Sequence, residues 1–185
     1  MAKKLFLGAM LGGLTLFVWG AISHMVLPTS EWVLYGFANE DAAKEAVVAN
    51  TPRSGVYFLP YVDTAGMSEE QQQATMERAT QGPVIFAAVR LGPTSGFGTL
   101  LVIQLLIEML SALVATWLLL QAKPLSYSGR VGFVVGIAAA IAGAGNLPEW
   151  NWYNFSTAFT AVECFDTIVG WALAGLVLGK VVPTE

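Results

Sequence analysis

The sequence predicts an all-α membrane protein, a four-transmembrane-helix bundle with a small external α/β cap between the first and second spans. Of its 185 residues, 55% are hydrophobic and only 12% are charged, whereas a soluble domain carries about 25% charged residues. Four segments are long and apolar enough to cross a bilayer, which takes about 20 residues. So few charges cannot cover the water-facing surface of a soluble protein of this length.

Charge and cysteine content exclude several other classes. The formal net charge is −4 and the chain has no basic run, which argues against binding to nucleic acid. Cys164 is the only cysteine. A disulfide framework, a redox pair and a cysteine-built zinc site are therefore excluded, and we expect Cys164 to pack as a small apolar side chain.

The four predicted spans are separated by short loops, except after the first. They cover residues 5–27, 97–121, 131–147 and 157–182. The apolar run of the first span exceeds the roughly 7–15 residues of a signal peptide and its exit lacks a typical cleavage site, which predicts an uncleaved anchor. We accordingly expect three regions: a first transmembrane helix over 1–27, an external segment over 28–93, and three further spans over 94–185.

Orientation follows from the positive residues near the span ends, which favour the cytoplasmic side. Five positive residues that adjoin the spans fall at one side of the predicted topology: Lys3, Lys4, Lys123, Arg130 and Lys180. We place Lys123 and Arg130 in a tight loop between the second and third spans. The sequence thus predicts a multi-pass protein of the bacterial inner membrane, with both termini in the cytoplasm and residues 28–93 in the periplasm.

The loop expected at the opposite face, residues 145–156, contains no lysine or arginine. It carries three aromatic residues of the types that collect at membrane–water interfaces: Trp150, Trp152 and Tyr153. We interpret these side chains as interfacial aromatics.

The external segment has signals for helix, strand, helix and strand. Asn39 is a suitable N-cap for a helix that ends before Asn50, and Ser68–Gln71 matches a capping box that opens a second helix. Two β-prone runs, 55–61 and 83–89, follow these helices. A two-stranded ribbon is marginal alone, so this segment is either a structured cap over the bundle or a module that recognises a ligand or partner.

Three carboxylates lie within the predicted spans, where each costs about 2.5–3.5 kcal/mol at a helix centre. Helical spacing places each one on a stripe of polar and small residues in the second or the fourth span, and we expect the two stripes to face each other. The predicted buried polar cluster comprises Gln104, Glu108, Ser111, Thr160, Glu163 and Asp166. His24, near the end of the first span, is placed to join the three carboxylates in one polar cavity.

The cluster admits four interpretations. Its carboxyl groups can be hydrogen-bonding contacts between helices, or a site that handles protons or cations. They can also form a metal site from His24, Glu108, Glu163 and Asp166, although a di-iron site needs paired Glu-x-x-His motifs that a single histidine cannot supply. The fourth interpretation is catalytic acid chemistry. The sequence contains no complete catalytic constellation, so it assigns no catalytic residue and no cofactor and leans against an enzyme.

Small residues recur at helical spacing in three spans. The longest such face lies in the third span and consists of Gly132, Gly136, Ala140 and Gly143. Shorter pairs are Gly8 with Gly12 and Gly175 with Gly179. Such faces let helices approach closely, either within the bundle or between protomers.

The chain resembles a family of small four-span bacterial inner-membrane proteins of unassigned function. The resemblance rests on short segments near the span ends: Ser23–Pro28, Gly55–Tyr57, Gly82–Phe86, Asn151–Tyr153 and Gly170–Gly175. It implies the four-span topology and no site residues.

A second family, the lipoprotein signal peptidases, is similar in having four spans and an aspartate pair. Ala144–Leu147 resembles one of its segments, and Asp166 lies where its last aspartate would be. Glu149 stands in place of the other aspartate, and the motif around Asp166 reads Glu163–Asp166 in place of Asn-x-Ala-Asp. The two broken motifs argue against aspartyl protease chemistry.

These observations favour a non-catalytic accessory or assembly subunit of a larger membrane complex. Its expected partners are the lipid bilayer and either other membrane subunits or further copies of the chain. The first alternative is a small carrier coupled to protons or cations through Glu108, Glu163 and Asp166. The second is an intramembrane enzyme that acts on an amphipathic or lipid substrate.

Overall fold

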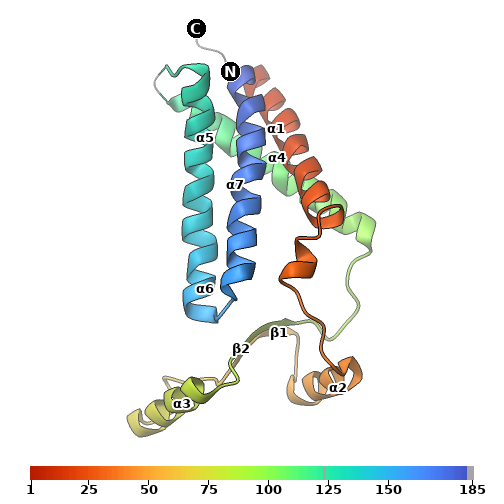
Figure 1. Cartoon of the computed structure of the whole chain (residues 1–185), viewed down its shortest axis with the longest axis vertical. Helices are drawn as coiled ribbons and strands as arrows, with labels where there is room; N and C mark the ends of the chain where they lie inside the picture. The colour runs from red at the N-terminus through yellow and green to blue at the C-terminus, as the bar shows by residue number, and fades with distance from the viewer. Residues whose placement is uncertain (123, 183–185) are drawn as a thin grey trace. The chain divides into compact units, whose positions relative to one another are not determined.

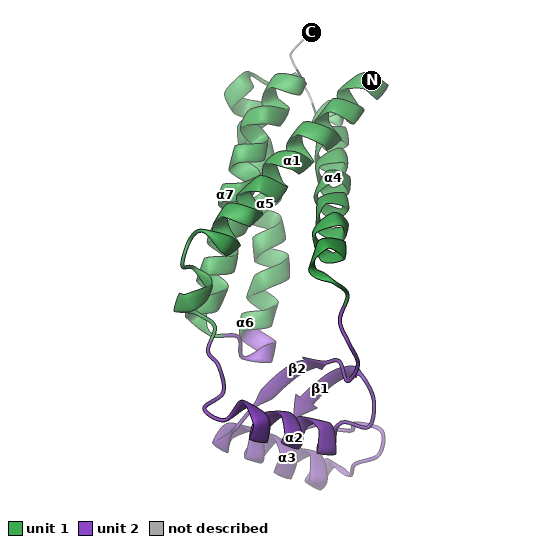
Figure 2. Ribbon diagram, turned by 90° about the vertical axis from the view of Figure 1, so that its right-hand side faces the viewer, with its two compact units in different colours: residues 1–34, 95–150, 156–185 green, residues 35–94, 151–155 purple. Residues whose placement is uncertain are grey.

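The computed structural model describes residues 1–122 and 124–182. The chain divides into two compact units (Figure 2). Unit 1 contains residues 1–34, 95–150 and those from 156 onward, and unit 2 contains residues 35–94 and 151–155. Lys123, one of the residues used to predict the orientation, lies outside the described residues.

Unit 1 is built from the four predicted spans (Figure 1). They are α1 (Ala2–Met25), α4 (Phe97–Gln121), the continuous segment Tyr127–Tyr153 and α7 (Thr157–Val181). Each is long and apolar enough to cross a membrane. This agrees with a multi-pass membrane protein and with the predicted helical bundle.

The third span differs from the prediction at both ends. It consists of α5 (Tyr127–Ile141), a π-helical turn (Ala142–Asn146) and α6 (Leu147–Tyr153), so it begins before residue 131 and continues beyond residue 147. Pro148 does not end the span; it lies in the first turn of α6, directly after the π-helical turn.

The placement of Arg130 in a loop is therefore wrong. Ser126 caps α5 by accepting a hydrogen bond from the Gly129 N–H, and this cap starts the helix before the arginine. Arg130 lies within α5 and is only 8% exposed. A charged residue beside an apolar run is typical of a loop, but the Arg130 side chain is buried and donates hydrogen bonds to two main-chain oxygens.

The spans pack in the order α4, α1, α7, α5. Helix α1 packs against both α4 and α7, and α5 packs against α7, while α4 touches α5 only lightly. Figure 2 shows α1 crossing obliquely from α4 toward α7. Within the described residues α4 and α7 are not a packed pair, so the stripes of the second and fourth spans do not pack directly on each other as we expected. The buried core is formed by Leu16, Ala112, Ala115, Leu119, Val134, Ala138, Trp171, Ala174, Leu178 and Val182.

Glycines on α1 allow this central helix to approach both neighbours. A methyl group added to Gly13 would lie 2.6 Å from the Cα of Met109 on α4. One added to Gly12 would lie 2.9 Å from Leu178 Cδ2 on α7. Real Cβ contacts are not this short, so close contact between the helices depends on glycine at these positions.

The two helices of unit 2 begin with the caps that the sequence predicts. After the short 3-10 helix η1 (Ser30–Trp32) of unit 1, α2 (Glu40–Asn50) starts at Asn39, whose side chain accepts a hydrogen bond from the Ala42 N–H. Helix α3 (Glu69–Gln81) starts with a complete capping box between Ser68 and Gln71.

The strands of unit 2 form a two-stranded antiparallel sheet. Strand β1 (Gly55–Leu59) pairs with β2 (Ile85–Val89), with Gly55 opposite Val89 and Leu59 opposite Ile85. The order helix, strand, helix, strand agrees with the sequence analysis. The position of this unit as an external cap stays a prediction.

Aromatic side chains join the sheet to the chain between α6 and α7. Tyr153 stacks on Phe86 with ring centroids 4.3 Å apart and meets Phe58 edge-on at 6.5 Å. Phe155 also lies against Phe86, at 6.4 Å. Tyr153 therefore belongs to an aromatic cluster of unit 2, a contact that no local sequence pattern predicts.

Candidate functional site

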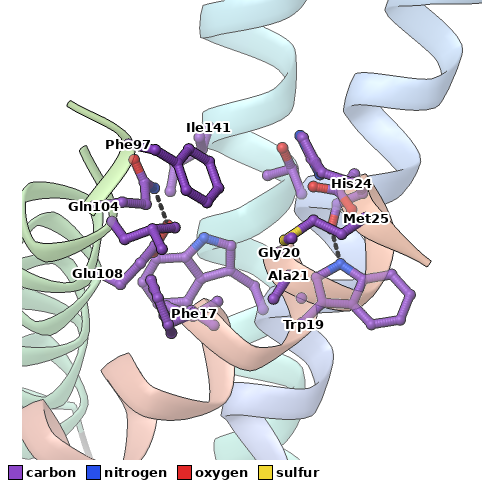
Figure 3. A pocket seen from close by; sticks show the side chains of 16 residues that line it. Phe17, Trp19, Gly20, Ala21, His24, Met25, Phe97, Gln104, Glu108 and Ile141 are labelled. Carbon is purple, nitrogen blue, oxygen red and sulfur yellow. Dashed lines mark hydrogen bonds between the residues drawn. The ribbon is translucent and has the colours of Figure 1, made fainter. Parts of the chain in front are cut away.

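A cavity of about 490 Å³ lies in unit 1 among α1, α4 and α7, with Ile141 of α5 also in its wall. It lies in the half of the spans where α1 ends and α4 begins. Four polar residues singled out from the sequence line it: His24, Gln104, Glu108 and Asp166. Figure 3 shows Gln104 and Glu108 at one side of the cavity and His24 at the other.

The α4 wall carries a paired amide and carboxylate. Gln104 donates a hydrogen bond from Nε2 to Glu108 Oε1 at 2.7 Å. Because the two residues are four apart on one helix, they lie on the same face one turn from each other. Glu108 is half-buried and Gln104 is exposed, so the pair presents a hydrogen-bonded acid at the cavity surface.

The α7 wall carries Asp166, whose carboxylate oxygen Oδ1 is buried and has no hydrogen-bond partner within the described residues. The nearby indole of Trp19 donates from Nε1 to the main-chain oxygen of Asp166 at 3.2 Å, not to its carboxylate. Gly170 makes room for that indole, since a methyl group there would lie 2.8 Å from Trp19 Cδ1. These contacts fix α1 to α7 and leave one carboxylate oxygen unpaired.

The other members of the predicted polar cluster do not line the cavity. Ser111 is half-buried on α4, and Thr160 is buried on α7 with its hydroxyl unpartnered in the described part of the chain. Glu163 is half-buried and lies within electrostatic range of His24 and Asp166. The structure therefore brings Gln104, Glu108 and Asp166 to one cavity and leaves Ser111, Thr160 and Glu163 outside it.

The geometry gives no support to a metal centre made from these residues. No three histidine, cysteine, aspartate or glutamate side chains converge on a common point anywhere in residues 1–122 and 124–182. Cys164 accepts a weak hydrogen bond from Asn146 Nδ2 at 3.8 Å. The cavity is lined by the carboxylates of Glu108 and Asp166 and by apolar and aromatic side chains, which suits binding of a cation or a hydrogen-bond donor.

Helix α5 of unit 1 has one packed face and one open face. One face packs on α7 through Arg130, Val134 and Ala138. Arg130 donates from Nε to the Gly179 oxygen at 2.9 Å and from Nη1 to the Leu125 oxygen at 2.7 Å. The Gly179 carbonyl lies in the last turn of α7, where carbonyls lack helical partners and a positive charge is favourable.

On the opposite side of α5 lies the small-residue face, which we define as Gly132, Gly136 and Ala140 of α5 together with Gly143 of the π-helical turn. Gly132, Gly136 and Ala140 are exposed. A methyl group added to Gly132, Gly136 or Gly143 would meet nothing within 4 Å. The sequence left open whether this face is used within the bundle; within the described residues, nothing packs beside its three glycines.

The predicted interfacial aromatics Trp150, Trp152 and Tyr153 lie in α6, just before the turn that leads to α7. Trp150 donates from Nε1 to Thr157 Oγ1 at 3.1 Å, and Trp152 is 71% exposed. Asn154 has a positive φ of 61°, a conformation that asparagine tolerates better than most residues. A location of these rings at a membrane surface stays a prediction.

Comparison of this chain with family models, with curated proteins and with solved structures gives no match. The resemblances drawn from short sequence segments therefore stay expectations.

Proposed function

We propose that the protein is a non-catalytic assembly subunit of a membrane complex, which docks a transmembrane helix of a different membrane protein on the small-residue face of α5. The observation that carries this proposal is the exposure of Gly132, Gly136 and Ala140, with open space beside both glycines.

Residues that only contact lipid have no reason to be small. On α4 the exposed positions carry large side chains, among them Val102, Leu106 and Leu110, each about 60% exposed. Glycine and alanine at helical spacing allow two helix backbones to approach closely, and the resulting van der Waals packing is one of the forces that associate helices in a bilayer. The contrast between the exposed faces of α4 and α5 favours a helix as the occupant on α5.

The small-residue face is also held rigidly. Arg130 ties the other side of α5 to α7 through two charge-assisted hydrogen bonds, and Val134 and Ala138 are fully buried beside it. A surface that is already ordered loses little entropy when a partner binds.

We further propose that the protein lies in the bacterial inner membrane with both termini in the cytoplasm and unit 2 in the periplasm. Lys3, Lys4 and Lys180 line one groove at the end of unit 1 where α1 begins and α7 ends. Clustered lysines favour the cytoplasmic side. Fusion of alkaline phosphatase to the C-terminus should give no activity, and fusion within residues 60–66 should give activity; the reverse result would contradict the orientation.

The assembly role is tested by Gly136→Leu, with Gly98→Leu as a matched control because a methyl group at Gly98 on α4 also meets nothing within 4 Å. Membranes would be extracted in mild detergent and separated on native gels. We expect the wild type and Gly98→Leu to migrate with a second protein in constant ratio, and Gly136→Leu to migrate alone with unchanged circular dichroism.

Two outcomes would refute the assembly role. One is a wild-type chain that migrates only as a monomer or as copies of itself. The other is a Gly136→Leu chain that keeps its partner. A photo-crosslinking residue at Ala140 provides a direct check, because its adducts should contain the partner and should disappear in Gly136→Leu.

A further inference from the structure

We infer that the cavity among α1, α4 and α7 is a binding site for a protonated primary or secondary amine that carries an apolar body. This inference does not depend on the assembly role, because the cavity and the small-residue face of α5 are made of different residues.

The first argument is the unpaired oxygen of Asp166. Buried polar atoms in proteins are almost always hydrogen-bonded, and leaving one unsatisfied is costly. Asp166 lines the cavity, and its Oδ1 is buried without a hydrogen-bond partner within the described residues. A carboxylate left without donors inside the protein favours a ligand that brings an N–H or O–H group to the cavity side of Asp166.

The second argument is charge. Glu108 and Asp166 line the same cavity and lie within electrostatic range of each other, while the lining contains no lysine or arginine. Two acids in a largely apolar site attract a cation and repel an anion. An ammonium group meets both requirements, because it carries a positive charge and donates hydrogen bonds.

The third argument is the aromatic lining and the size of the cavity. Four aromatic rings line the cavity: Phe17, Trp19, Phe97 and Trp171. Aromatic faces attract ammonium groups and also cover an apolar body. A volume of about 490 Å³ falls in the usual range for small organic ligands. A bare calcium or magnesium ion is a poor fit, since these ions prefer six or more oxygens.

The site is tested with octylamine as the probe and the full chain in phosphatidylcholine nanodiscs. The phosphatidylcholine headgroup is a quaternary ammonium, so it has no N–H to donate. Octyltrimethylammonium keeps the charge without the donor, and octanol keeps the apolar chain without the charge. We expect saturable octylamine binding above that of empty nanodiscs, at least about tenfold weaker binding of the quaternary compound, and no saturable binding of octanol.

Three variants locate the binding. Asp166→Asn should weaken octylamine binding by about tenfold or more, the loss expected for one charge-assisted hydrogen bond. Gly20→Leu should abolish it without disturbing the fold, because Gly20 lines the cavity and a methyl group there meets nothing within 4 Å. Gly98→Leu is the matched control for Gly20→Leu, since Gly98 does not line the cavity and a methyl group there also meets nothing within 4 Å, and it should bind as the wild type does.

Added phosphatidylethanolamine identifies the source of the amine. If it displaces octylamine, the ligand is a lipid headgroup; if it does not, the ligand is a free amphipathic amine. Absence of saturable octylamine binding, equal binding of octanol, or unchanged binding in both Asp166→Asn and Gly20→Leu would overturn the inference.

The same variants separate this inference from the assembly role. Gly20→Leu should lose the amine and keep the partner protein, whereas Gly136→Leu should lose the partner and keep the amine. Failure of one proposal therefore leaves the other measurable.

Discussion

Helices α1 and α5 carry similar rows of small residues, yet the structure uses them in opposite ways. On α1, Gly8, Gly12 and Gly13 are buried against α4 and α7. On α5, Gly132 and Gly136 face open space. The difference comes from position: α1 packs between two spans, whereas α5 lies at the end of the order α4, α1, α7, α5 and, within the described residues, packs extensively only against α7. A small-residue pattern therefore indicates a close approach without indicating which helix approaches.

The largest contrast should come from placing leucine on each row. Gly13→Leu would force atoms into the backbone of Met109, because even a methyl group would lie 2.6 Å from its Cα. We expect it to lower the free energy of unfolding by about 3 kcal/mol. Gly136→Leu has room and replaces a poor helix former, so it should leave that free energy unchanged or raise it by up to about 1 kcal/mol. Denaturant titration in detergent measures both values.

The proposal requires that Gly13→Leu loses stability and Gly136→Leu does not. Similar losses of unfolding free energy in the two variants would mean that the α5 row is packed within the isolated chain. A stable Gly13→Leu would mean that α1 and α4 are not held in close contact.

The next effect concerns how α5 is held on its covered side. Arg130→Leu removes the hydrogen bonds to the Gly179 and Leu125 oxygens and leaves those carbonyls without their charged donor. Hydrogen bonds to charged groups contribute about 1.5–3 kcal/mol each, so we expect a loss of about 3 kcal/mol, or less if water reaches the carbonyls. Arg130→Lys should lose less unfolding free energy than Arg130→Leu, because lysine keeps the positive charge, although its ammonium group lacks the planar guanidinium that reaches both carbonyls. Equal losses would show that the charge contributes nothing.

Arg130 also shows where sequence reasoning about the spans fails. The number of spans follows from hydropathy alone, and α4 begins and ends where the apolar run does, at Phe97 and Gln121. A charged residue next to an apolar run looks like a loop residue in the sequence. Whether its side chain finds buried carbonyls depends on a second helix, here the end of α7, which no local pattern reveals.

The candidate site has the same limit. Helical spacing places Glu108 on one stripe and Glu163 and Asp166 on another, but it does not fix how each helix is rotated toward its neighbours. The structure brings Glu108 and Asp166 to one cavity and leaves Glu163 outside it. The aromatic walls were not predicted, because Trp19 and Phe97 are ordinary apolar residues until α1 and α4 enclose a space.

A smaller effect tests a single contact within the α1 row. A methyl group on Gly8 would overlap the side chain of Thr116 on α4, so Gly8→Ala should cost about 1–2 kcal/mol. Thr116→Ala removes most of the obstruction. We therefore expect the double variant to be more stable than the sum of the two single losses by about 1 kcal/mol. Additive losses in this cycle would show that the two residues do not touch.

The smallest effect is a gain of stability on the α5 row where the same change on α1 causes a loss. Gly132→Ala adds a methyl group in open space and replaces a poor helix former with the best one. Alanine is favoured over glycine in a helix by up to about 1 kcal/mol, so this variant should be slightly more stable than the wild type, whereas Gly8→Ala on α1 should be less stable. Alanine is still small enough for a close helix approach, so the partner should remain bound in native gels. A destabilised Gly132→Ala chain, measured without partner, would mean that another part of the same molecule covers this face. The contrast between α1 and α5 would then be lost, and the assembly proposal with it.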